Sequence, residues 1–167
     1  MRKILTTAAV AAVLVGANGT QAATTTTTFV VSATVVKTCS VSAGALAFTN
    51  YTPGGGAVTN SSTVNVNCTK TTPFTVALNG GTTTGGTVAQ RLMANGANTL
   101  EYNLFTTNTY ATVFGDGSGT SATQSSTGAG VATAVPFTVW GQLPDSANNK
   151  NAVPGAYTDT ITVTVTY

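Results

Sequence analysis

Residues with catalytic side chains are few in this 167-residue chain, and histidine is absent. The carboxylates are widely separated, at Glu101, Asp116, Asp145 and Asp159. Without histidine there is no Ser-His-Asp triad, no usual general base and no common zinc ligand set. The sequence therefore predicts that the protein is not an enzyme and holds no metal or cofactor. Hydrolysis by two carboxylates that the fold brings together is the alternative.

The first residues have the pattern of a secretory signal peptide. Two basic residues open the chain, and an apolar stretch over 4–17 precedes a small-x-small sequence over 20–22. This stretch is shorter than the roughly 20 apolar residues of a membrane span. We therefore expect residues 1–22 to be a signal peptide and the mature protein to begin at Ala23. A permanent N-terminal anchor is the alternative.

Cys39 and Cys68 are the only cysteines. In a chain exported to an oxidising compartment, two cysteines are expected to form a disulfide. Two free thiols are the alternative. Because Cys68 shares the phase of Val64 and Val66, the sequence places it on an inward strand face.

The charge of the mature chain excludes several classes of partner. Removing the signal peptide leaves four basic residues against the four carboxylates, for a net charge of zero. No basic patch remains for nucleic acid or anionic lipid. A net charge near zero also favours self-association over repulsion between molecules. The remaining basic residues are Lys37, Lys70, Arg91 and Lys150.

Two local features resemble ligand sites. The segment Gly115–Gly119 lacks the Gly-Lys-Ser/Thr of a phosphate loop, and Asp116 is its single acid, too few for calcium. We interpret it as a tight turn. Trp140 falls on the opposite strand face from Phe137 and Val139. A packed structural aromatic is the preferred interpretation of Trp140, and a ligand platform is the alternative.

The pattern of apolar residues predicts short strands and no helix outside the signal peptide. Apolar side chains recur at every second position between Gly- and Asn-rich turns, which is typical of an antiparallel β-sandwich. We expect a single domain over 39–167, with a mobile Ser/Thr/Gly-rich loop over 118–130. The predicted strands cover 41–48 (bent near Gly44), 62–68, 73–78, 91–93, 99–105, 135–143 and 157–167.

A further apolar strand is predicted before Cys39, outside the disulfide loop. Its side chains alternate from Phe29, and a polar run, Thr24–Thr28, precedes it. We define residues 23–38 as the N-terminal extension. The side chains on one face of its strand are Phe29, Val31, Ala33 and Val35.

Over nearly the whole mature chain, the sequence resembles the spore coat protein U family, the archaic (Csu-type) chaperone–usher pilins. The resemblance depends on several blocks in a fixed order, each weak by itself. It departs from the family at Phe114, where tryptophan is expected. The blocks are Cys39-Ser40-Val41 with 46–48, 64–68 with 72–79, 91–93 with 100–105, 113–117, and 154–167.

The resemblance implies an all-β fold, an incomplete immunoglobulin-like antiparallel β-sandwich that lacks its last strand. A periplasmic chaperone would fill the resulting groove first, and the N-terminal extension of a neighbouring subunit would replace it. The donor strand would be Phe29, Val31, Ala33 and Val35. One wall of the acceptor groove would be the first strand after Cys39, and the other would contain Ile161, Val163 and Val165.

The function implied is that of a structural subunit of a surface pilus, assembled by donor-strand exchange and supporting adhesion and biofilm formation. Its partners would be neighbouring pilin copies, the chaperone and an outer-membrane usher, with no nucleic acid. It would be exported through the periplasm to the cell surface. The alternative is a secreted module that fills its groove with its own strand and binds a glycan or a surface.

Overall fold

The computed structural model of the protein describes residues 19 and 21–167. It consists of two units, 1–34 and 35–167, which are described separately. In the first unit, the described residues form no helix or strand and are exposed. Most of the predicted signal peptide lies outside the described residues.

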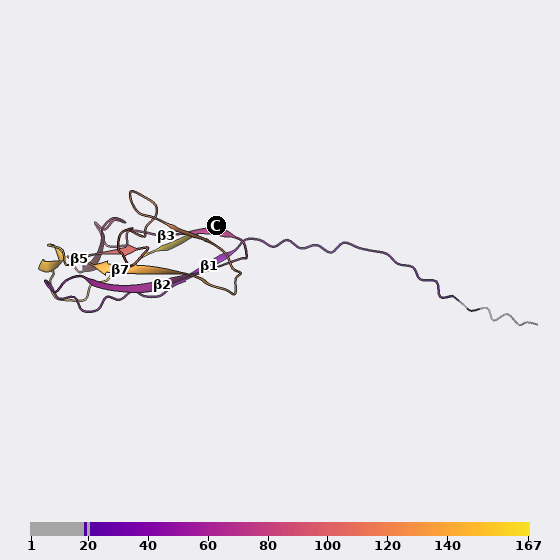
Figure 1. Ribbon diagram of the computed structural model, residues 1–167, viewed down its shortest axis with the longest axis horizontal. Helices are drawn as coiled ribbons and strands as arrows, with labels where there is room; N and C mark the ends of the chain where they lie inside the picture. Colours follow the sequence, from indigo (N-terminus) through magenta and orange to yellow (C-terminus); the bar gives the residue numbers. More distant parts are fainter. Residues whose placement is uncertain (1–18, 20) are drawn as a thin grey trace, which may run out of the picture. The chain divides into compact units, whose positions relative to one another are not determined.

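The second unit consists of two antiparallel sheets, with β3 in a different layer from β2 and β7 (Figure 1). The strand order is β1-β2-β7-β5-β4 in the larger sheet and β6-β3-β8 in the smaller. The predicted all-β antiparallel sandwich is confirmed. None of the helices among the described residues has the length and apolarity to cross a membrane. The elements are β1 (Cys39–Ala43), β2 (Val58–Cys68), β3 (Pro73–Leu78), β4 (Arg91–Asn95), β5 (Asn98–Phe105), β6 (Gln124–Thr127), β7 (Val135–Leu143), the 3-10 helix η1 (Asn149–Asn151) and β8 (Val163–Thr166).

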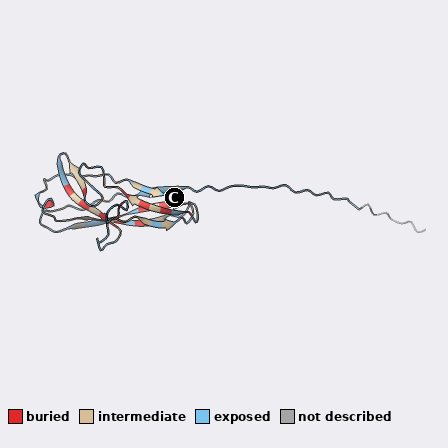
Figure 2. Ribbon diagram, turned by 90° about the horizontal axis from the view of Figure 1, so that it is seen from above, coloured by how far each residue is buried: buried red, intermediate tan, exposed pale blue. Residues whose placement is uncertain are grey.

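The core lies between the sheets and follows the two-residue period of the sequence. Buried positions alternate along β2, β3, β5 and β7 (Figure 2). Phe74 of β3 and Phe137 of β7 meet edge to face across the two sheets, with ring centroids 5.9 Å apart. Such aromatic pairs add to the stabilisation from burial alone. The alternating apolar residues therefore account for which strand faces meet.

A disulfide joins Cys39 to Cys68 at the end of the core. The two residues are also directly opposite one another in the β1–β2 register. Cys68 is fully buried, in agreement with its inward phase. The bond therefore ties the edge strand β1 to β2.

Replacing both cysteines by serine is expected to lower the free energy of unfolding by about 3–4 kcal/mol, since the bond closes a loop with a sequence separation of 29. Urea denaturation followed by fluorescence of the single tryptophan would measure the loss. Ser40→Ala on the exposed face of β1 is the control and is expected to change little. An unchanged denaturation midpoint for the double serine variant would contradict this account of the disulfide.

Several predicted elements differ in the structure. The strand predicted over 41–48 ends at Ala43, just before the expected bend. The loop predicted over 118–130 contains β6, which pairs with the edge of β3 although its sequence has no apolar alternation. The last strand spans only Val163–Thr166, because its pairing with β3 ends at Leu78. Residues 157–162, which continue the alternation, therefore have no register partner in β3.

Candidate functional site

The candidate site begins with an edge strand, β1, whose inward side chains are uncovered. β1 is at the edge of the larger sheet and pairs only with β2. Val41 is 42% exposed, yet Val66, its partner in the register, is completely buried. Ala43 is likewise exposed opposite the buried Val64. Because paired residues share a face of the sheet, Val41 and Ala43 face the core side and are not covered.

The edge strand of the smaller sheet, β8, has the same feature. Val163 and Val165 are half-buried, whereas their partners on β3, Leu78 and Val76, are at most 1% exposed. β8 pairs with β3 on one side, and its other backbone edge is open. β1 and β8 also approach one another. The sandwich therefore has two neighbouring strand edges whose core-facing side chains no strand covers.

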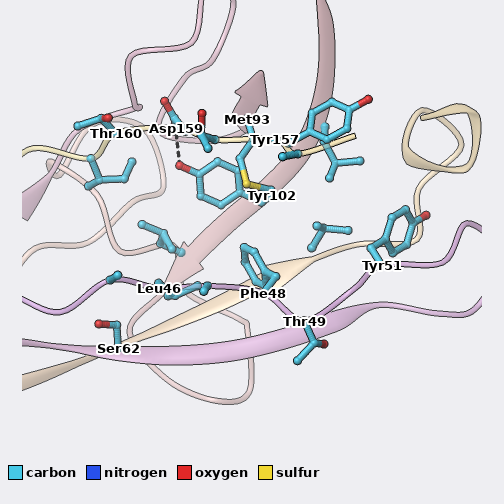
Figure 3. Close-up of a pocket in the computed structure, with 18 of the residues that line it drawn as sticks. Leu46, Phe48, Thr49, Tyr51, Ser62, Met93, Tyr102, Tyr157, Asp159 and Thr160 are labelled. Atoms are coloured by element: carbon cyan, nitrogen blue, oxygen red, sulfur yellow. Dashed lines mark hydrogen bonds between the residues drawn. The ribbon is translucent and has the colours of Figure 1, made fainter. Parts of the chain in front are cut away.

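A groove of about 840 Å³ lies between these two edges. One wall is the chain after β1, over 43–51, and the other is the chain that leads into β8, over 152–161. In Figure 3, the ring of Tyr102 lies between Phe48 of the first wall and Asp159 of the second. The floor comes from β2, β3, β5 and β7 and contains Val64, Leu78, Leu100, Tyr102, Leu104, Val139 and Leu143.

Of the three residues predicted for the β8 wall, two line the groove and one does not. Ile161 and Val163 line the groove, as does the segment that follows β1. Val165 packs against the core from β8 but is not among the groove-lining residues. The groove is thus open toward the chain before β8, and not toward the disulfide.

The predicted donor residues form no strand. Phe29, Val31 and Val35 are 82–86% exposed, and Ala33 is exposed as well. Residues 21–38 are in no helix or strand. An isolated strand has no ladder partner, so an extended, unpaired chain is the state expected before it meets an acceptor. The donor role of these four residues stays a prediction.

Asp159 anchors the β8 wall of the groove. Its Oδ1 accepts hydrogen bonds from the backbone N–H groups of Thr82 and Thr83, at 2.8 and 3.1 Å. Both threonine hydroxyls also donate to this oxygen, and the Tyr102 hydroxyl donates to Oδ2 over 2.7 Å (Figure 3). The chain at Gly81, with φ of 91°, approaches so closely that a Cβ there would collide with the carboxylate.

These contacts change the pKa values of both partners. Burial is the largest influence on Asp159 and opposes ionisation, but its pKa is lowered because the hydrogen bonds from Tyr102, Thr82 and Thr160 together favour the charged form. Burial raises the pKa of Tyr102, and the bond to Asp159 raises it further. At neutral pH, Asp159 is therefore a carboxylate and Tyr102 a neutral donor.

Asp145 anchors the opposite wall in a similar way. Its Oδ1 accepts hydrogen bonds from the Tyr51 hydroxyl at 2.5 Å and from the Gly54 N–H at 2.9 Å, and its Oδ2 accepts from Gly56 at 3.4 Å. Lys150 lies 3.6 Å from the same carboxylate. Burial, with the bond to Asp145, raises the pKa of Tyr51 to about 12. Asp145 thus ties the chain over 51–56 to the loop after β7.

Arg91 is completely buried, and its contacts connect segments that are far apart in the sequence. Its guanidinium donates to the carbonyls of Asn79 and Phe114, both at 2.9 Å, and to the Asn103 side chain at 2.6 Å. Burial lowers the pKa of Arg91. The local sequence pattern indicated only that Arg91 belongs to a short strand. The one sign of a buried role in the sequence was an arginine within the otherwise apolar segment 91–93.

The two local features weighed as ligand sites have structural explanations. Asp116 accepts hydrogen bonds from the N–H and hydroxyl of Ser118, as in a tight turn. Trp140 lies on the outer face of its sheet, half-buried between Ser61 and Phe105 in the register. Across residues 19 and 21–167, no group of three potential metal ligands comes together.

Comparison with known families agrees with this geometry. The model of the Spore Coat Protein U domain matches residues 25–164. The chain belongs to this family. The resemblance predicted from the ordered sequence blocks is thereby confirmed, and the match spans both the N-terminal extension and the sandwich. No curated protein matches the chain.

The fold of this Spore Coat Protein U domain is similar to a solved pilus protein. The similar chain is in the crystal structure of the CsuC–CsuE chaperone–tip adhesion subunit pre-assembly complex from the archaic chaperone–usher Csu pili of Acinetobacter baumannii. The TM-score is 0.57 at 23% identity, over 80% of this chain. Only 41% of that chain is covered, so the present protein spans less than half its length. This likeness establishes the fold.

Proposed function

We propose that this protein is a subunit of a chaperone–usher pilus and that its groove accepts a donor strand from a neighbouring subunit. One observation carries the proposal: Ala43 lines the groove and is exposed, while its register partner, Val64, is buried. An uncovered core-facing side chain at a sheet edge is what a missing strand would leave. The family membership and the fold shared with a Csu pilus complex support the same conclusion.

An added strand would pair with the open backbone edge of the groove and would cover its apolar side chains. The open edge of β8 offers unpaired N–H and C=O groups, which are an aggregation hazard unless covered. A strand that pairs there gains main-chain hydrogen bonds and places every second side chain in the groove. Burying the four donor side chains of one face would contribute on the order of 5–8 kcal/mol before entropic costs.

Each subunit would give one strand and receive one, so contacts between subunits are head-to-tail. Such contacts do not close on themselves and generate a filament. A periplasmic chaperone would cover the groove before assembly, and an outer-membrane usher would export the growing fibre to the cell surface. There the fibre would support adhesion and biofilm formation.

We expect Val31→Thr to reduce polymer formation strongly, whereas Val30→Thr changes it little. Val31 shares its strand face with Phe29 and is predicted to enter the groove, and Val30 is on the opposite face. Loss of a buried valine costs about 1.5–3 kcal/mol, roughly a tenfold to hundredfold loss of donor affinity. Ladders of polymers on gels of unboiled protein would measure the outcome.

The two variants are matched, because each introduces the same hydroxyl into the same apolar segment. A general effect of polarity on export or folding would appear in both. Equal loss of polymer in the two variants would show that the predicted register is wrong. Unchanged polymer in both would count against insertion of this segment into the groove.

A further inference from the structure

The walls of the acceptor groove have little strand pairing where the groove is open, since the β8 wall has only an isolated bridge between Thr158 and Ala94 there. β1 ends at Ala43 and β8 begins at Val163. Between them, residues 44–57 and 159–162 belong to no strand. A chain segment without ladder bonds next to an apolar groove tends to collapse into it, because collapse buries apolar surface. Other contacts must hold these segments in place.

Two carboxylates supply such contacts, one on each wall. Asp159 accepts five hydrogen bonds, four from the 82–83 loop and one from Tyr102 on the groove floor. Asp145 accepts three hydrogen bonds from the chain over 51–56. Hydrogen bonds to a charged acceptor are stronger than neutral ones. These two residues are half the carboxylates of the entire chain.

We propose that Asp159 and Asp145 are positioning residues of the acceptor groove, which keep its two walls apart and ready for a donor strand. They act through the wall segments that they hold in place. This inference rests on the proposed donor-strand function. In the empty subunit the carboxylates take the place of the ladder that only a bound donor supplies.

The two carboxylates matter most while the groove is empty. After the donor binds, the new ladder holds the β8 wall, and the carboxylate bonds become partly redundant. Loss of either carboxylate therefore slows acceptance of a donor far more than it destabilises a subunit whose groove is already filled. A residue that merely stabilises the fold would affect both states alike.

The test uses the full-length chain in complex with its periplasmic chaperone and a fluorescent synthetic peptide of residues 24–38 as donor. Asp159→Ala and Asp145→Ala are each expected to slow peptide uptake about tenfold or more. Asp159→Asn, which keeps one acceptor oxygen for the loop, is expected to recover much of the rate. Asp116→Ala is the matched control, because Asp116 forms its turn with Ser118 outside the groove.

A second measurement separates positioning from folding. A chain in which residues 24–38 follow Tyr167 through a flexible linker fills its own groove. In this filled form, both alanine variants are expected to melt within about 4 °C of the unsubstituted chain.

Three outcomes would overturn the inference. Uptake at the wild-type rate in both alanine variants would do so while leaving the proposed function intact. A large fall in the melting temperature of the alanine variants in the filled form, together with slower uptake, would show that both residues only stabilise the fold. Failure of the unsubstituted complex to take up the peptide would overturn the proposed function, and this inference with it.

Discussion

Removal of residues 23–36 is expected to abolish polymer formation completely while binding to the chaperone persists. The sandwich over 39–167 keeps its disulfide, its core and its groove, so it still offers a surface for the chaperone. It no longer carries the apolar segment that would fill the groove of a neighbour. Size-exclusion chromatography and electron microscopy of protein purified from the periplasm would measure both properties.

The control is removal of 24–28 alone, which leaves the segment from Phe29 onward. Since the threonine run contributes no apolar side chain, polymers are expected to form. A truncated protein that is a stable, soluble monomer without chaperone would contradict the donor-strand proposal. A single monomer peak from the intact chain would instead favour the secreted module that fills its own groove.

Replacing Arg91 by methionine is expected to lower the free energy of unfolding by about 3–5 kcal/mol. Methionine fills much of the volume but donates no hydrogen bond, so the carbonyls of Asn79 and Phe114 lose their buried donor. Each buried, unpaired polar group costs about 1–3 kcal/mol. Urea denaturation of the donor-filled subunit, followed by fluorescence of Trp140, would measure the loss.

Two further variants isolate the cause of this effect. Arg91→Lys keeps the charge but loses the planar fork of donors, and it is expected to fall between the native protein and the methionine variant. Lys70→Met removes an exposed cation and is expected to change stability little. Native stability in Arg91→Met would show that water reaches these carbonyls and replaces the guanidinium.

Much of the sandwich could be predicted from the sequence because a strand's inward face depends on its own two-residue period. β2 illustrates this, since Val64, Val66 and Cys68 are all buried as their phase predicts. The disulfide followed from two cysteines in a chain with a predicted signal peptide. The family resemblance also predicted a groove wall of Ile161, Val163 and Val165, and its role as acceptor stays a prediction.

The bounds of the strands could not be predicted from local pattern. Residues 157–162 continue the alternation of β8 but form no strand, because β3 ends at Leu78 and offers no further ladder. β6 has no apolar alternation and is nonetheless a strand, because the edge of β3 is free to pair with it. In both cases a partner distant in sequence decides whether hydrogen bonds can form.

By itself, then, the sequence determined the class of fold, the inward faces of its strands and the segment proposed as donor. Only the tertiary structure decided where the groove opens, that Asp145 and Asp159 anchor its walls, and that Arg91 is completely buried. The physical reason is the range of the interactions. The alternation of apolar residues, and the burial that follows from it, depend on residues that are neighbours in the sequence. The carboxylate and guanidinium contacts, in contrast, join segments that only the packed sheets bring together.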